Sequence, residues 1–246
     1  MQSDKPWKPE AVLLLGAGLM ICLSGGMLIT LVVRSFWPDF MPAQQTFQNF
    51  LINGVSFQFG GLVLTHFFLK VHELTWAEFL GLKNPNLLRA VVLSLGVTVV
   101  ALPLILGLNQ VCLTVLTHLS GTPPTQPTMQ VLEASVSLGQ RICFGISAIV
   151  LAPVVEEILF RAILYRSIRQ RGYPGIALFG SALLFGAIHA SWMTFLPLTI
   201  LAIILALLYD KAENLMAPIV AHSVFNATNF FFFIYQRDLE RWWKQF

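Results

Sequence analysis

Three groups of polar residues interrupt apolar stretches in the second half of this sequence. With one flanking phenylalanine, they are Glu156, Glu157 and Arg161; Phe185 and His189; and His222 and Asn226. An ionisable side chain in a hydrocarbon layer costs at least ~2.5 kcal/mol on insertion scales, so it marks function by default. Carboxylate, imidazole and amide groups together are able to activate a water molecule and stabilise an oxyanion.

The two adjacent glutamates are predicted to have different roles. Neighbouring side chains on a helix point ~100° apart, so the two carboxylates are not expected to serve one small site equally. Glu157 and Arg161 are spaced i, i+4 and are predicted to form a supporting ion pair. Glu156 has no such partner on its own helix and is predicted to do the chemistry. Pro153 lacks an N–H and is expected to bend the helix just ahead of the glutamates.

The histidines and the asparagine complete the requirements for peptide hydrolysis. A carboxylate that helices remove from water is a competent general base, so Glu156 and His189 would hold and deprotonate a water molecule. His222 and Asn226 share one helix face and would donate hydrogen bonds to the oxyanion that forms when water attacks an amide. No serine or cysteine has a clear base partner, which argues against a covalent mechanism.

The residues alone leave other hypotheses open. Glu156, His189 and His222 are also a reasonable zinc-ligand set with one position left for water, although the helix motif H-E-x-x-H is absent. Histidine and asparagine in membrane helices often only hydrogen-bond to neighbouring helices. A non-catalytic immunity or scaffold protein is therefore a second hypothesis. An ion-coupled transporter would predict internal repeats, and the sequence contains none.

The elements that must position these residues are transmembrane helices. Of 246 residues, 56% are hydrophobic and 11% are charged, and the mean hydropathy is +0.73. A water-soluble domain carries about a quarter charged residues. Because a span needs ~20 apolar residues, the predicted fold class is an all-α polytopic transmembrane bundle of about seven (six to eight) helices with a polar intramembrane cavity. The predicted spans are Ala11–Val33, Phe50–Leu69, Ala90–Leu108, Ile142–Tyr165, Pro174–Ala190, Phe195–Tyr209 and Leu215–Tyr235.

Helix geometry predicts that the polar groups lie at compatible depths. At ~1.5 Å per residue from the inner helix ends, Glu156 is roughly 14–18 Å deep and His189 roughly 22 Å deep. His222 is roughly 10 Å deep and Asn226 roughly 16 Å deep on the same scale. The four side chains are therefore expected to meet in one cavity in the inner half of the membrane.

Lysine and arginine outside the spans orient the chain. With the N-terminus in the cytoplasm, the inner side collects Lys5, Lys8, Lys70, Lys83, Arg89, Arg166, Arg169, Arg171 and Lys211. The outer side then collects Arg34, Arg141, Arg237, Arg241 and Lys244. The positive-inside bias favours this orientation, although it places a basic C-terminal tail outside. We expect one membrane domain, with N-terminal helices and an interfacial segment in residues 1–140, catalytic helices in 141–235 and a polar tail in 236–246.

Smaller features complete the prediction. The stretch from Lys70 to Arg89 is amphipathic, and Thr75 to Glu78 fits a capping box. The segment from Gly121 to Pro127 is a loop that no helix should cross. The three cysteines form no CxxC pair and are interpreted as apolar packing residues. Three histidines near span ends are interpreted as interfacial, namely His66, His72 and His118.

The ordered motifs resemble a known family. The patterns Glu-Glu-x-x-x-Arg, Phe-x-x-x-His and His-x-x-x-Asn lie on successive hydrophobic helices, as in the CAAX protease and bacteriocin-processing family, also called Abi or type II CAAX prenyl endopeptidases. The resemblance runs from about Ala152 to Asn226 through APVVEEILFRAILY, LLFGAIH and NLMAPIVAHSVFN. Members often have glycine at the position of Ala162, and this difference affects only helix packing.

The resemblance implies a membrane-embedded glutamate protease, a family earlier assigned to the metalloproteases. Carried over by motif, Glu156 would be the base, His189 would help to activate the water, His222 and Asn226 would form the oxyanion site, and Glu157, Arg161 and Phe185 would support it. Eukaryotic members cleave prenylated CAAX ends, and bacterial relatives are linked to bacteriocin maturation or self-immunity. We expect no obligatory cofactor, with zinc as the alternative. The expected partners are membrane lipid and a peptide or protein substrate rather than nucleic acid, and the expected location is a bacterial inner (plasma) membrane.

Overall fold

The computed structural model describes residues 6–39, 47–121, 126–135 and 137–243, and every regular element within these ranges is a helix. The elements are α1 Pro9–Phe36, α2 Phe47–Val71, α3 Trp76–Phe79, α4 Leu87–Ser120, α5 Pro127–Ala134, α6 Leu138–Ile146, η1 Ser147–Leu151, α7 Ala152–Glu157, η2 Ile158–Tyr165, α8 Arg166–Gln170, η3 Ile176–Gly180, α9 Ser181–Ile188, α10 Trp192–Ala212 and α11 Met216–Trp243. The segments η1, η2 and η3 are π-helical. The predicted all-α membrane bundle is confirmed.

Within the described residues, six helices are long and apolar enough to cross a membrane. They are Pro9–Phe36, Phe47–Val71, Leu87–Ser120, Leu138–Gln170, Trp192–Ala212 and Met216–Gln236. The fifth predicted span, Pro174–Ala190, is the shorter apolar helix Ile176–Ile188. At 1.5 Å per residue it is only about 20 Å long, against ~30 Å for a hydrocarbon core. It ends where His189 and Ala190 turn the chain, Ala190 having a φ of 49°.

The fourth helix is longer than its hydropathy predicts. We expected it to end near Leu108, but α4 continues to Ser120. Its last turns carry hydroxyl side chains that donate to carbonyls one turn earlier, as Thr114 does to Gln110 and Thr117 does to Leu113. A hydroxyl that is satisfied inside its own helix does not stop the helix. α4 ends just before the predicted loop, and α5 begins at its last residue, Pro127. Residues 122–125 of this loop lie outside the described part.

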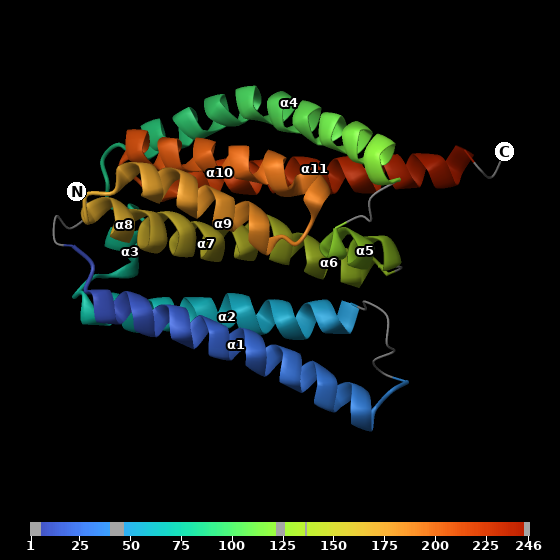
Figure 1. Ribbon diagram of the computed structural model, residues 1–246, viewed down its shortest axis with the longest axis horizontal. Helices are drawn as coiled ribbons and strands as arrows, with labels where there is room; N and C mark the ends of the chain where they lie inside the picture. The colour runs from blue at the N-terminus through green and yellow to red at the C-terminus, as the bar shows by residue number, and fades with distance from the viewer. Residues whose placement is uncertain (1–5, 40–46, 122–125, 136, 244–246) are drawn as a thin grey trace.

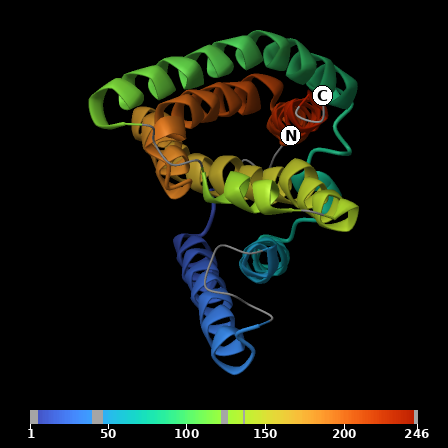
Figure 2. The same cartoon turned by 90° about the vertical axis from the view of Figure 1, so that its right-hand side faces the viewer.

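The helices lie roughly parallel in layers, with α4 outermost and α10 and α11 beneath it (Figure 1). The irregular helix from α6 to α8 and the short α9 occupy the middle, while the α1–α2 pair stands apart on the other side (Figures 1 and 2). In the apolar stretch of α10, 50% of the residues are buried, and in that of residues 138–170, 44% are. The corresponding share is 11% for α1 and for α2. The helices that carry the candidate site residues are therefore the central ones, and α1 and α2 face mostly lipid.

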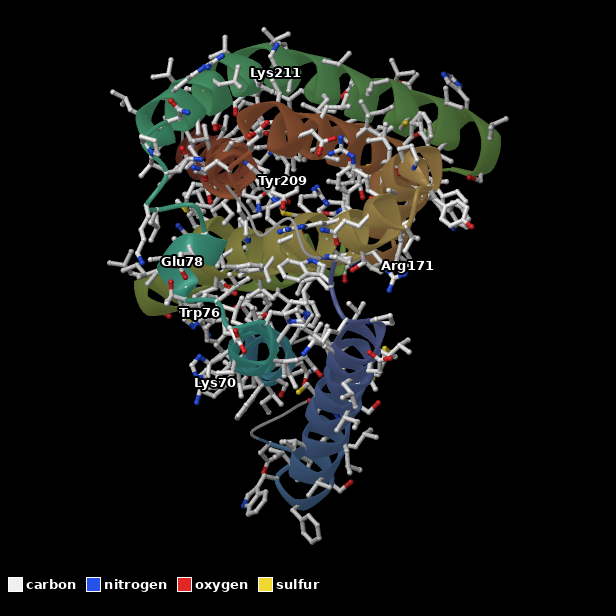
Figure 3. All side chains as sticks on the ribbon, turned by 90° about the vertical axis from the view of Figure 1, so that its left-hand side faces the viewer. Lys70, Trp76, Glu78, Arg171, Tyr209 and Lys211 are labelled. Carbon is white, nitrogen blue, oxygen red and sulfur yellow. The ribbon has the colours of Figure 1, made fainter. Side chains whose placement is uncertain are left out.

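The described ends of the chain lie at opposite ends of the bundle (Figure 1). The end that begins α1 also carries Lys70, Arg171 and Lys211, three of the residues predicted to face the cytoplasm (Figure 3). The predicted capping box is present there as well, because the Thr75 side chain accepts from the Glu78 N–H and Glu78 accepts from the Thr75 N–H. These three basic residues thus lie at one end of the bundle and the end of α11 at the other. Which end faces the cytoplasm stays a prediction.

Candidate active site

The helix that carries the glutamates changes register on both sides of them. In η1 the N–H of Ala152 donates to Ser147 instead of Ala148, its partner in a regular α-helix. Pro153 follows at once, within the first turn of α7, and its missing N–H removes a further α-helical bond. We expected a bend at this proline, and the structure has a π-helical segment just before it. Such segments occur frequently at functional sites.

After the glutamates the same irregularity returns in η2. The N–H of Arg166 donates to the carbonyls of Arg161 and Ile163 and bypasses Ala162. Besides the Ile149 carbonyl, which Pro153 leaves without a donor, the carbonyls of Ala148 and Ala162 therefore lack the donor that a regular α-helix would supply. Each must find another donor, because an unsatisfied buried backbone group is costly.

Glu157 and Arg161 form the predicted ion pair deep inside the bundle. Arg161 Nε lies 2.8 Å from Glu157 Oε2, and the two side chains are 1% and 0% exposed. The Nε–H of Arg161 does not point at this oxygen well enough to form a hydrogen bond. Neither Nη1 nor Nη2 of Arg161 has a hydrogen-bond partner among the described residues. The guanidinium instead lies over the ring of Phe185, 4.9 Å from its centroid. The charge of Arg161 is thus balanced by Glu157 and covered by an aromatic face.

His222 lies between the two glutamates. Its Nδ1 is 2.8 Å from Glu157 Oε1, and its Nε2 is 3.8 Å from Glu156 Oε2. His222 is 3% exposed, whereas Glu156 is only partly buried. We expected the two neighbouring carboxylates not to serve one small site equally, and their distances to His222 do differ. Both carboxylates contact His222 because its two nitrogens lie on opposite edges of the imidazole ring, and each of the diverging carboxylates faces one edge.

Asn226 lies one turn beyond His222 on α11. Its Nδ2 donates to the carbonyl of Ala148 at 2.8 Å, the carbonyl that the η1 register leaves without its α-helical donor. An amide NH2 has two donors, so this bond engages one of them. Asn226 therefore ties α11 to the π-helical segment that precedes the glutamates.

His189 reaches this cluster through Phe185. Its Nδ1 lies 2.7 Å from the Phe185 carbonyl, which only accepts, so the proton is on Nδ1 and Nε2 is left as the acceptor. The Phe185 ring contacts the imidazoles of both His189 and His222, with centroids 4.9 Å and 5.8 Å apart. The structure therefore brings Glu156, Glu157 and His222 into one cluster, with Asn226 one turn away and His189 in contact with Phe185, whose ring also contacts His222.

The expected zinc ligands do not converge as a metal site. Among the described residues, no three His, Cys, Asp or Glu side chains are grouped so that they could hold a metal ion. Glu157, the partner of His222 Nδ1, was not in the proposed ligand set, and the contacts of His189 are with the carbonyl and the ring of Phe185. The described residues thus give the zinc hypothesis for Glu156, His189 and His222 no support, and it stays a prediction.

Asn214 is a positioning contact that sequence reasoning missed. It is fully buried, its Oδ1 accepts from the N–H of Met216 at the start of α11, and its Nδ2 donates to the Gly81 carbonyl. Gly81 has a φ of 78° and approaches this side chain closely. Asparagine just before a helix is a usual capping residue, which was the signal available in the sequence. This contact fixes the start of the helix that carries His222 and Asn226.

In the part of the chain that the structure describes, six helices long and apolar enough to cross a membrane surround a buried carboxylate–imidazole cluster. This architecture defines an integral, multi-pass membrane protein with a polar site inside the bundle. Residues 138–228 match the sequence model of the family described as "Type II CAAX prenyl endopeptidase Rce1-like". The family resemblance is thus confirmed over this segment, which holds all the motif residues.

A curated relative matches as well. It is "Putative membrane peptidase YdiL" from Bacillus subtilis (strain 168), 30% identical over 77 residues. The match covers 31% of this chain and 32% of that protein, so it spans about a third of the length of the relative. No solved structure gives a significant match.

Proposed function

We propose that this protein is an intramembrane endopeptidase that hydrolyses a peptide bond of a membrane-associated substrate with a directly activated water molecule. The observation that carries the proposal is the position of His222, whose two ring nitrogens face Glu157 at 2.8 Å and Glu156 at 3.8 Å. The match of residues 138–228 to a CAAX endopeptidase family supports the same chemistry.

Charge balance assigns the proton positions in this proposal. Glu157 is paired with Arg161 and only accepts, so His222 carries a proton on Nδ1. A second proton on Nε2 makes His222 an imidazolium, and the two glutamates, the arginine and the imidazolium then carry no net charge. Buried charges are tolerated when they are compensated in this way. The 3.8 Å between Nε2 and Glu156 Oε2 exceeds a direct hydrogen bond and suits two groups that share a water molecule.

The reaction follows from this arrangement. Glu156 accepts a proton from the water, and the water oxygen attacks the carbonyl carbon of the scissile amide. His222 Nε2–H and the second N–H of Asn226 donate to the oxyanion. The C–N bond then breaks, and the leaving amine takes the proton from Glu156. His189 is proposed to help hold the water, and Glu157, Arg161 and Phe185 keep His222 in place.

The proposed substrate is a prenylated peptide with a CAAX-type end. This proposal rests on the family that residues 138–228 match, because its description names a CAAX prenyl endopeptidase. We also propose a bacterial plasma membrane as the location, since the curated relative is from Bacillus subtilis.

The test uses purified protein in lipid nanodiscs with two peptides of one sequence, one farnesylated at a CAAX cysteine and one unmodified. Wild type should cleave the farnesylated peptide, and Glu156→Gln should lower kcat by about 100-fold or more, the usual contribution of a general base. Glu10→Gln, which changes an exposed carboxylate at the start of α1, is the matched control. Equal cleavage by wild type and Glu156→Gln would refute the assigned role, and no cleavage by wild type would favour a binding function.

Metal dependence is tested separately by elemental analysis of the active protein. Full activity with far less than one zinc ion per chain is the expected result. Activity that follows the zinc content would instead support the alternative ligand set of Glu156, His189 and His222.

A further inference from the structure

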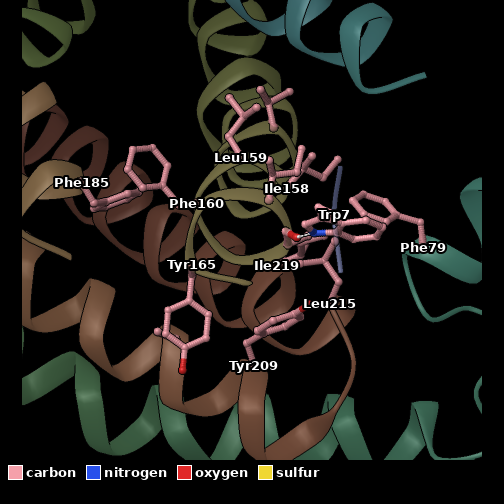
Figure 4. Packing of buried hydrophobic residues seen from close by; sticks show 14 of the residues in the cluster. Trp7, Phe79, Ile158, Leu159, Phe160, Tyr165, Phe185, Tyr209, Leu215 and Ile219 are labelled. Carbon is pink, nitrogen blue, oxygen red and sulfur yellow. Dashed lines mark hydrogen bonds between the residues drawn. The ribbon is translucent and has the colours of Figure 1, made fainter. Parts of the chain in front are cut away.

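The segment that precedes α1 reaches into the centre of the bundle. Trp7 is 3% exposed and belongs to the main buried cluster. Its ring packs edge-on against Phe68 and His72, at centroid distances of 5.2 Å and 4.8 Å. Figure 4 shows Trp7 beside Phe79 of α3, within the buried residues that surround the glutamate helix. A residue outside the spans is thus packed as tightly as the core.

Trp7 makes a specific contact with η2. Its indole Nε1–H donates to the carbonyl of Ala162 at 2.7 Å, in a buried position. This is the carbonyl that the N–H of Arg166 bypasses. The guanidinium of Arg166 lies over the Trp7 ring, 4.2 Å from its centroid. The indole therefore supplies the donor that the π register removes, and a cation covers its face.

A side-chain donor binds a backbone carbonyl of the glutamate helix on both sides of the glutamates. On one side Asn226 donates to the Ala148 carbonyl of η1, and on the other Trp7 donates to the Ala162 carbonyl of η2. Each donor comes from a helix or segment far away in the sequence, and each satisfies a carbonyl that lost its α-helical partner. The registers of η1 and η2 are therefore each stabilised from outside the helix.

We propose that Trp7 is a positioning residue for the peptidase site, a role that rests on the function proposed above. By holding the Ala162 carbonyl, Trp7 keeps η2 in its π register. That register sets the direction of the neighbouring Arg161 side chain toward Glu157, which in turn orients His222. Trp7 itself touches no reacting group.

Two backbone contacts hold Trp7 in place. The N–H of Trp7 donates to Gln170 Oε1 on α8 at 3.2 Å, and the N–H of Lys8 donates to His72 Nε2 at 3.1 Å. His72 Nδ1 faces the Phe68 carbonyl at 2.8 Å, so its proton is on Nδ1 and Nε2 is the acceptor. We interpreted His72 from the sequence as a plain interfacial residue, and the structure gives it this role in anchoring the segment before α1.

The experiment compares a variant that lacks the indole N–H alone with one that also lacks part of the ring. Trp7 is replaced by phenylalanine and, at the same position, by 3-benzothienylalanine, which keeps the shape of tryptophan with sulfur in place of N–H. Trp37→Phe is the matched control, because Trp37 is exposed and lies at the far end of α1. We expect kcat to fall by about fivefold, which corresponds to ~1 kcal/mol for an unsatisfied buried carbonyl, with KM within about twofold. Hydrogen exchange of amides 158–165 should also increase.

The readouts separate positioning from stability and from failure of the proposed function. If both Trp7 variants melt at a lower temperature while kcat of the folded protein is unchanged, the positioning role is wrong. If wild type cleaves no peptide, the proposed function fails. Hydrogen exchange of amides 158–165 then decides by itself whether Trp7 holds the register of η2. Faster exchange at 158–165 in the benzothienylalanine variant, with none in Trp37→Phe, supports the register role, and unchanged exchange overturns it.

Discussion

Replacing Glu157 by glutamine isolates the electrostatic role of a carboxylate that is 0% exposed. Glutamine keeps the length of the side chain and an oxygen that can accept from His222 Nδ1. It removes the charge that faces Arg161 at 2.8 Å. Arg161 would then keep the faces of Phe160 and Phe185 and the weaker attraction of Glu156. Its terminal nitrogens have no hydrogen-bond partner among the described residues. Leaving a buried charge without its partner costs about 3–5 kcal/mol.

This loss is measurable as a free energy of unfolding, by titration with SDS in mixed micelles. Glu157→Gln and Arg161→Met should each lower it by about 3–5 kcal/mol, out of a typical total of about 5–15 kcal/mol. The double variant should lose less than the sum, because no uncompensated charge remains. Lys83→Met is the control, since it breaks a 3.3 Å ion pair with Glu78 whose side chains are 62% and 44% exposed. An exposed pair contributes about 0–1 kcal/mol.

Two results would refute the reasoning. If Glu157→Gln loses no more stability than Lys83→Met, the charge of Arg161 is solvated or compensated by another group. If the double variant loses the full sum of the single losses, the two side chains do not act as a pair. Either result would remove the support that we assign to His222 through Glu157.

Three further outcomes are expected. Asn226→Ala should lower stability by about 1–3 kcal/mol, because a carbonyl of η1 loses its donor, and it should speed hydrogen exchange in residues 147–151. Hydrogen bonds from Thr75 lower the pKa of Glu78 from 4.5 to about 2. The capping-box contribution is therefore complete above pH 4.5 and lost as the pH falls toward 2, and ¹³C NMR titration of Thr75→Val should show the Glu78 pKa closer to 4.5. Gly186→Ala should cost about 1–3 kcal/mol, because its Cβ would overlap α10, whereas Gly16→Ala, with open space at its Cβ, should be nearly neutral in thermal unfolding.

Hydropathy predicted the spanning helices well because composition alone decides whether a segment dissolves in lipid. It failed at two helix ends. The predicted span Pro174–Ala190 is mostly apolar, yet its helix ends at Ile188, where the chain turns through the left-handed Ala190. The hydroxyls near the end of α4 lower its hydropathy without ending the helix, since they bond to their own backbone. Both ends depend on local backbone contacts that a hydropathy average does not contain.

Contacts within one helix were also predictable. The i, i+4 spacing predicted the Glu157–Arg161 pair, and the Thr75–Glu78 pattern predicted the capping box. The contacts of His222 with both glutamates join residues 65 positions apart or more, and that of Asn226 joins residues 78 apart. Spacing along one helix has no bearing on such contacts, so their partners stayed unassigned.

The sequence by itself determined that this chain is a membrane bundle and which polar residues its helices carry, because both follow from composition and helical period. Only the tertiary structure decided how those residues combine. It placed one imidazole between two adjacent carboxylates, and it showed that the glutamate helix leaves two carbonyls to distant side chains, Asn226 and Trp7. The register of a helix and the rotation of its neighbours result from packing among all of the helices, and no single segment encodes that packing.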